Sequence, residues 1–291
     1  MGFTIVHPRV NLEIKLEAVD HLVVHEKILE NYLRRLVVEL QSDKCLMHPV
    51  VVDRKSLVVL DGMHRMAAAR ELGWRVIPVC LIDYNNSNVS VRSWYRLINP
   101  RSDIKRVTRA IEDLGFSLKE RSLADACDLI EKREAMASLA FASSCYSIHG
   151  VQETIKAVYD AINEIELKLS AEGYSVGYET ESDARSKMAS GEAFFMLMVP
   201  TVSKEEVVKA ALSGQIFSHK TTRHVLPLRP LFINLPFDWL YSTSSLDKLN
   251  EKLVKHLSAK RFVRLPPGQI LDRRYEEELY VFKDGPDPPS V

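Results

Sequence analysis

The stretch from Val50 to Gly73, VVVDRKSLVVLDGMHRMAAARELG, limits the possible folds of this chain more than any other part of its sequence. Its two apolar runs predict short strands joined by a polar turn. The alanine-rich segment from Met63 to Leu72 predicts a helix, which Gly73 is placed to end. A strand that leads directly into a helix is typical of a mixed α/β fold.

The five residues Asp61-Gly62-Met63-His64-Arg65 stand where this strand becomes the helix. The first turn of a helix has backbone N–H groups without intrahelical partners and carries the positive end of the helix dipole. Gly62 permits close approach, and the guanidinium of Arg65 can bind two oxygens of one anion. The motif therefore predicts a phosphate site. Taken alone, it leaves open that Asp61 only caps the helix while His64 and Arg65 lie in solvent.

Composition excludes several classes of protein. The 291 residues include 39 basic and 39 acidic ones, so a surface that coats nucleic acid is not expected. No apolar run approaches the length that spans a bilayer, and the N-terminus lacks the layout of a signal peptide. Four cysteines without a CxxC pair predict reduced thiols rather than disulfides or zinc ligands. We therefore expect a cytoplasmic protein with no membrane partner.

Hydrophobic periodicity extends the mixed α/β expectation along the chain. Helical spacing of apolar residues predicts helices over 27–40, 151–169, 204–212 and 246–257, and a mostly helical region over 103–133. Continuous apolar runs predict buried strands over 76–82, 136–148 and 193–199.

Several motifs together resemble the ParB/sulfiredoxin-like fold and, within it, the free L-serine kinases. They are His25-Glu26, His48-Pro49-Val50, Asp61-Gly62-Met63-His64-Arg65, Leu72-Gly73, Trp94 and the segment His219-Lys220-Thr221-Thr222-Arg223-His224. The resemblance implies a ParB-like domain over 1–100 that binds nucleotide and phosphate. It also implies a smaller C-terminal α/β domain over 101–291 that contributes the substrate loop, with the active-site cleft between the two.

The resemblance implies phosphoryl transfer from ATP or ADP to the hydroxyl of free L-serine. The product would be O-phospho-L-serine, for cysteine or related amino-acid biosynthesis. Such transfer needs a phosphate cradle, a divalent metal and an oriented nucleophile. The cradle is assigned to Asp61, Gly62, Met63, His64 and Arg65. No P-loop or kinase glycine-rich motif is present to provide another one.

Two carboxylates are the implied catalytic groups. Glu26 is the candidate general base for the serine hydroxyl. Asp61 is a second acid–base group or a ligand of Mg²⁺, which prefers carboxylate and phosphate oxygens. Without the resemblance, Glu26 would be interpreted as support for the first turn of the following helix. The sequence does not decide between ATP and ADP, and it does not determine the oligomeric state.

Serine recognition needs donors for its carboxylate and acceptors for its ammonium group. Thr221, Thr222, Arg223 and His224 offer hydroxyl, guanidinium and imidazole groups in one short segment, and Trp94 is expected as an apolar wall. The alternatives are a polar connecting loop and a tryptophan that belongs to the core.

Met63 departs from the kinase pattern, in which many members have a second histidine at this position. Sulfiredoxins have their catalytic cysteine there, and a thioether cannot replace a thiolate, so a redox repair enzyme is disfavoured. The second interpretation is a ParB-like, nucleotide-dependent regulator that binds DNA. The balanced charge and the lack of a helix-turn-helix signature stand against it.

Overall fold

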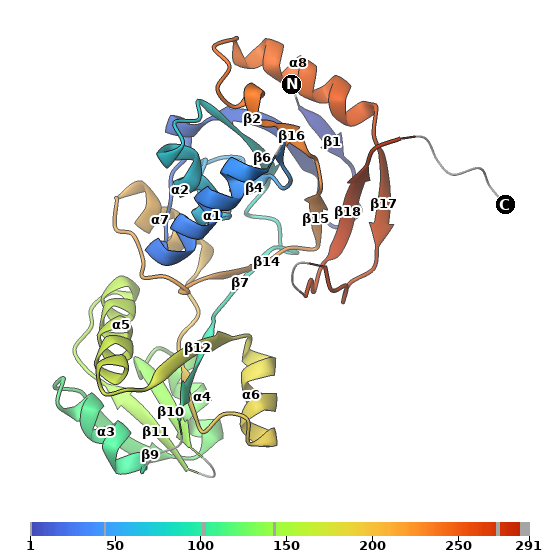
Figure 1. The fold of residues 1–291 in the computed structure, drawn as a ribbon. Helices are drawn as coiled ribbons and strands as arrows, with labels where there is room; N and C mark the ends of the chain where they lie inside the picture. The colour runs from blue at the N-terminus through green and yellow to red at the C-terminus, as the bar shows by residue number, and fades with distance from the viewer. Residues whose placement is uncertain (1, 44, 101–102, 142–143, 272–273, 286–291) are drawn as a thin grey trace. The chain divides into compact units, whose positions relative to one another are not determined.

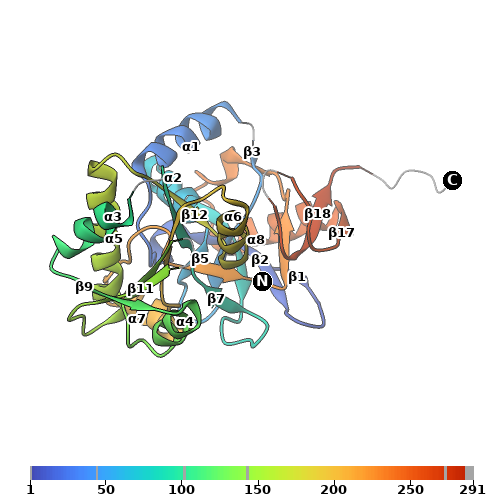
Figure 2. The same ribbon diagram turned by 90° about the horizontal axis from the view of Figure 1, so that it is seen from below.

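Strands and helices alternate in both units into which the chain divides (Figure 1, Figure 2). The computed structural model describes residues 2–43, 45–100, 103–141, 144–271 and 274–285. The first unit comprises residues 1–90, 207–216 and 224–291, and the second comprises 91–206 and 217–223. These units differ from the expected segments 1–100 and 101–291, because the residues from His224 onward pack with the N-terminal ones.

A five-stranded mixed sheet forms the centre of the first unit. Its order is β1 (Phe3–Ile5), β2 (Leu12–Ala18), β6 (Val76–Ile82), β4 (Val50–Asp53) and β5 (Val59–Asp61). The middle strand β6 runs antiparallel to β2 and parallel to β4. All of its residues are buried, as its unbroken apolar sequence VIPVCLI requires. A smaller sheet contains β15 (Leu228–Leu231), β18 (Glu278–Lys283) and β17 (Arg261–Leu265), and β3 (Cys45–Leu46) pairs with β16 (Leu235–Pro236).

Three helices complete most of the first unit. Helix α1 (Glu30–Ser42) packs on α2 (Met63–Glu71), which Figure 2 also shows. Helix α8 (Leu246–Ser258) packs on β2, where the buried amide of Asn250 accepts a hydrogen bond from Leu16 N at 2.7 Å and donates one to Leu16 O at 3.1 Å. Short 3₁₀ turns lie at η1 (Val19–His21) and η2 (Phe237–Trp239). Three elements contain residues of both units: β7 (Ser90–Arg92), α7 (Lys204–Leu212) and β14 (Arg223–Val225).

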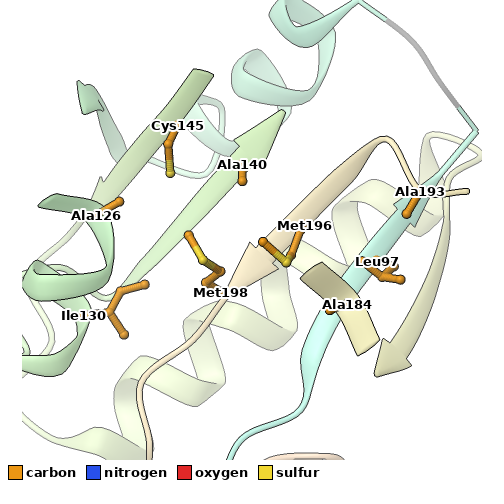
Figure 3. Packing of buried hydrophobic residues seen from close by; sticks show 9 residues of the cluster. All are labelled: Leu97, Ala126, Ile130, Ala140, Cys145, Ala184, Ala193, Met196 and Met198. Atoms are coloured by element: carbon orange, nitrogen blue, oxygen red, sulfur yellow. The ribbon is translucent and has the colours of Figure 1, made fainter. Parts of the chain in front are cut away.

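The second unit is built on a six-stranded antiparallel sheet. Its order is β12 (Ser175–Glu179), β8 (Tyr95–Asn99), β13 (Phe195–Met198), β10 (Ala137–Phe141), β11 (Ser144–His149) and β9 (Ser117–Arg121). Helices α4 (Leu123–Glu131) and α6 (Glu181–Ser190) cover the face shown in Figure 3, where small and sulfur-containing side chains form the core. Helices α3 (Ile104–Glu112) and α5 (Ile155–Ala171) pack against each other. Among the described residues, no helix combines the length and the apolar character needed to cross a bilayer.

Most of the expected elements are present, including the helices α3 and α4 of the mostly helical region 103–133, and one expectation was wrong. The mixed α/β class is confirmed, and so are the strand–helix junction at 59–71 and the helix at 246–258. The region 103–133 is interrupted by β9, whose residues are mostly exposed at a sheet edge and therefore give no hydrophobic signal. The segment 136–148 forms two antiparallel strands rather than one, and residues 142–143 between them lie outside the described part of the chain.

Gly62 is required by both backbone conformation and space. Its φ of +99° lies in the left-handed region. A Cβ atom there would lie 2.7 Å from Cγ1 of Val50 in the buried strand β4. We expect Gly62→Ala to lower the free energy of unfolding by about 2–4 kcal/mol, the sum of backbone strain and overpacking.

Gly73→Ala is the matched control for that measurement. Gly73 also has a positive φ, +70°, but open space surrounds its Cα. Gly73→Ala should lower the free energy of unfolding, measured with urea, by only about 1 kcal/mol. Equal losses for the two variants would contradict the importance of the contact with Val50.

Candidate functional site

Residues 23–26 run alongside β5 in the first unit. The Val23 N–H donates to Leu57 O at 3.1 Å, and Val59 N donates to Val23 O at 2.8 Å. These two bonds define a parallel bridge between Val23 and Val58. Two residues further, Nδ1 of His25 bonds Val59 O at 2.8 Å. The segment is therefore bound to the strand that ends at the phosphate motif.

The same alignment continues to the start of α2. Leu29 N donates to Nε2 of His64 at 3.1 Å. This contact and the Val23–Val58 bridge hold the segment that contains Glu26 against β5 and the start of α2, where Asp61 lies. Glu26 is half-buried, forms an isolated β-bridge and precedes α1, which begins at Glu30.

Asp61 lies between two guanidinium groups. Arg229, which is buried, bonds the Asp61 carboxylate and also pairs with Glu277. Arg65 lies one helical turn after Asp61 and approaches it to 3.6 Å. Burial alone would lower the pKa of Arg229, but the carboxylates of Asp61 and Glu277 outweigh it and raise that pKa above its usual range. The ion pairs with Arg229 and Arg65 thus hold the Asp61 carboxylate in position.

The side chains of His64 and Arg65 have structural partners of their own. Nε2 of His64 accepts the hydrogen bond from Leu29. Arg65 donates to the carbonyl oxygens of His48 at 2.9 Å and Pro49 at 2.6 Å, just before β4. These bonds fasten the start of α2 to two neighbouring segments, so neither residue lies on a merely solvated helix face.

The start of α2 has the properties of an anion site. Gly62 has no side chain to cap the helix, and the first turn contains no acidic residue. A cavity of about 160 Å³ lies close by, lined by His48, Pro49, Val51, Asp61, Arg65, Arg229, Pro230, Leu231 and Tyr275. Arg65 and Arg229 are balanced by Asp61 and Glu277, so the N–H groups and the positive end of the helix dipole are what favour an oxyanion there.

The residues around Asp61 offer few ligands for a divalent metal. No cluster of three or more His, Cys, Asp or Glu side chains that could hold a metal occurs within the described residues. Asp61 is a single carboxylate beside Arg65 and Arg229. One carboxylate together with substrate phosphates is a common way to hold Mg²⁺. The donor set fits Mg²⁺ that enters with a nucleotide, rather than a site built from protein ligands alone.

Two buried histidines, His25 and His224, contact each other near Asp61. The rings of His25 and His224 are 5.4 Å apart, and Nε2 of His224 lies 2.7 Å from the Tyr84 hydroxyl. Burial lowers the pKa of His25 to about 4. Burial and the neighbouring His25 lower the pKa of His224 to about 3, so both rings are neutral at neutral pH. His224, expected to contact substrate, is thus buried and hydrogen-bonded to Tyr84.

The other expected substrate residues belong to the second unit. Nε1 of Trp94 donates to Thr222 O at 3.1 Å, and Nζ of Lys220 lies 4.4 Å from the centre of the Trp94 ring. Arg223 lies 5.9 Å from the same centre and 3.7 Å from the Glu181 carboxylate. Trp94 is half-buried and contacts the cationic segment, so it is not a plain core residue.

Thr221 has a different environment from its neighbours. It is fully buried, and its hydroxyl donates to Ser218 O at 2.8 Å. Its hydroxyl therefore closes the turn that carries Lys220 and Thr222, in which Lys220 has a positive φ of 58°.

A buried ion pair is connected to residues 219–223 through a chain of contacts. Arg96 is fully buried and bonds Glu166 at 2.6 Å. The Tyr178 hydroxyl donates to the other oxygen of Glu166 at 2.6 Å and lies 2.7 Å from Nε2 of His219. Burial, followed by the charge of Glu166, raises the pKa of Tyr178. The chain of contacts from Arg96 to His219 ends one residue before Lys220.

Sequence reasoning missed Arg229, Tyr84 and Tyr178. Arg229 is 168 positions from Asp61, and Tyr84 is 140 positions from His224. No local spacing or motif connects such residues. The only signal in the sequence was an arginine inside the apolar run LRPL of β15, since a buried arginine requires a carboxylate partner.

The two buried histidines predict a stability that depends on pH. Their pKa values lie below the ordinary value of 6.5 in the folded state, so the unfolded chain binds more protons between about pH 6.5 and 4. The free energy of unfolding should therefore decrease as the pH is lowered through this window, by at most about 1.4 kcal/mol per pH unit for each histidine. Urea unfolding at pH 7, 6 and 5 measures this slope. His224→Asn should reduce the slope by roughly half, and an unchanged slope would contradict the assignment.

Comparison with known proteins agrees with this architecture. No protein-family model matches the chain. An ATP-dependent L-serine kinase of Staphylothermus marinus is 32% identical over 244 residues, which are 80% of this chain and 93% of that protein. An ADP-dependent L-serine kinase of Thermococcus kodakarensis is 26% identical over 76% of this chain and 90% of the relative.

A solved structure supports the same conclusion. A free serine kinase in complex with AMP superposes with a TM-score of 0.66 at 26% identity, over 78% of this chain and 93% of that one. The similarity in sequence spans nearly the full length of the relatives, and the fold agrees with it. The chain therefore belongs to the family of free L-serine kinases.

Proposed function

We propose that this protein transfers a phosphoryl group from a nucleotide to the hydroxyl of free L-serine, which gives O-phospho-L-serine. The observation that carries the proposal is the set of contacts that hold residues 23–29, which include Glu26, against β5 and the start of α2. The AMP complex of the similar free serine kinase supports a nucleotide as the second ligand.

Each group in the first unit has a distinct task in this proposal. The N–H groups of the first turn after Gly62, together with Arg65, bind the phosphate that is transferred. Glu26 accepts the proton of the serine hydroxyl as the oxygen attacks phosphorus. Asp61 holds Mg²⁺, which neutralises the charge on the phosphate oxygens. Arg229 keeps the Asp61 carboxylate in place, and His25 and His224 act as neutral positioning residues behind it.

The second unit contributes residues for the amino acid. We assign the carboxylate of serine to the cationic segment of Lys220 and Arg223 with the polar groups of Thr222. Trp94 keeps that segment in position through its bond to Thr222 O and its contact with Lys220. The hydrogen bonds of Tyr178 with Glu166 and His219 hold the residue that precedes Lys220 in position.

The donor in this proposal is ATP. Relatives that share 32% and 30% of their residues with this chain are ATP-dependent, whereas the ADP-dependent relative shares 26%. We further propose that the product enters cysteine or related amino-acid biosynthesis and that the enzyme acts in the cytoplasm. The four cysteines are unbridged, which agrees with a reducing compartment.

Replacement of the general base tests the mechanism. With Mg²⁺, L-serine and ATP, the wild-type protein should form O-phosphoserine, detected by ³¹P NMR. Glu26→Gln keeps the size of the side chain but cannot accept the proton, so kcat should fall by about 10²–10⁴-fold.

Glu30→Gln is the matched control for this variant. Glu30 is an exposed residue at the first position of α1, four residues after Glu26. It should retain wild-type turnover. A Glu26→Gln protein that remains folded and equally active would contradict the role of Glu26, and absence of product from the wild type with both ATP and ADP would contradict the function.

A second substitution tests serine recognition. Arg223→Gln removes a cation from the segment beside Trp94. If this cation binds the serine carboxylate, KM for serine should rise by about 10-fold or more while KM for the nucleotide stays within about 2-fold. Arg109→Gln, at an exposed position of α3, serves as control. A change confined to kcat would contradict the assignment.

A further inference from the structure

The face of the second unit's sheet shown in Figure 3 contains a hollow between α4 and α6. Ala140 of β10 lies directly opposite Cys145 of β11 and Met196 of β13. Residues directly opposite in an antiparallel sheet point to the same face, so these three side chains form a floor. Alanine is the smallest of them and lies in the middle, so the floor is hollowed at its centre. The cavity has a volume of about 500 Å³, within the range of small-molecule sites.

Two helices provide the walls of this hollow. Arg185, Met188 and Ala189 of α6 line it, and their spacing puts them on one face of that helix. Leu123, the first residue of α4, lines the other side and is 46% exposed. The short side chain of Ala189 and the lack of one at Gly191 keep the space from being filled.

Arg185 is the one charged side chain on the cavity wall. Its guanidinium bonds Sγ of Cys127 at 3.3 Å and lies 6.0 Å from the centre of the Tyr95 ring. It forms no ion pair with a carboxylate in the described ranges of the chain. Burial raises the pKa of the neighbouring Cys145 thiol to about 11, so this floor residue carries no opposing charge.

We propose that this cavity binds a small amphipathic carboxylate, whose apolar body lies on Ala140 and Met196 and whose anionic group pairs with Arg185. An apolar floor alone would accept any hydrophobic molecule. The single guanidinium at the wall, held by a thiol and a phenol ring, selects one with a negative charge. The cavity lies wholly in the second unit and shares no residue with the serine kinase assignments, so the proposal is independent of the proposed function.

The probe is sodium decanoate, with 1-decanol as its uncharged counterpart. The eight methionines of the chain are labelled with ¹³C in their methyl groups and followed by NMR during titration. The signals of Met188 and Met196 should shift and saturate. Met63 and Met66 belong to the first unit and should not move, so they serve as internal references. Decanol should bind about 3–10-fold more weakly, because it lacks the charge that pairs with Arg185.

Three variants separate the apolar and the charged parts of the site. Ala189→Leu places a larger side chain in the hollow from an exposed helix position and should abolish the shifts of Met188 and Met196. Arg185→Gln should weaken decanoate about 3–10-fold and leave decanol unchanged. Lys187→Gln, which removes a cation from the same helix outside the cavity, should change neither affinity.

Specific outcomes would overturn the proposal. Shifts that spread to Met63 and Met66 without saturation would show nonspecific association of decanoate. Equal affinities for decanoate and decanol, or an Arg185→Gln protein that binds decanoate as well as the wild type, would contradict recognition of an anion. Saturable binding that persists in Ala189→Leu would place the decanoate elsewhere.

Discussion

Hydrogen bonds between residues 23–29 and 57–64 join a segment without regular secondary structure to the last strand of the first sheet and the first turn of α2. The bonds at Val23 are backbone pairs, while those at His25 and Leu29 use an imidazole as donor or acceptor. They hold the segment that contains Glu26 against the strand end and helix start that contain Asp61. If residues 23–29 moved by one position, Glu26 would turn to the opposite side, because side chains alternate along an extended segment.

Both units use a buried guanidinium to restrain a functional segment. In the first unit, Arg229 pairs with both Asp61 and Glu277. In the second unit, Arg96 pairs with Glu166, which accepts the Tyr178 hydroxyl and so connects to His219. Separation of the partners would leave an uncompensated buried charge, so each pair holds its side chains in one arrangement. The segments that they restrain are the end of β5 and residues 219–223.

Local sequence patterns predicted the elements but only part of their connections. The strand–helix junction around Gly62 was predictable, because an apolar run is followed directly by an alanine-rich segment; the positive φ and the close approach of Val50 explain why glycine stands between them. The partners of His64 and Arg65 were not, since Leu29 and the carbonyls of His48 and Pro49 meet them only after folding. The exposed edge strand β9 and the hairpin of β10 and β11 were missed because neither interrupts hydrophobic periodicity in a recognisable way.

In the proposed mechanism the phosphate is bound at the start of α2 and Glu26 contacts the serine hydroxyl. A crystal structure of the protein with Mg²⁺, L-serine and a non-hydrolysable ATP analogue tests both contacts directly. We expect the terminal phosphate to accept hydrogen bonds from the backbone N–H groups of residues 63–65. We also expect the Glu26 carboxylate within hydrogen-bond distance of the serine hydroxyl. A terminal phosphate bound away from this helix start, or a Glu26 side chain that points away from serine, would contradict the mechanism.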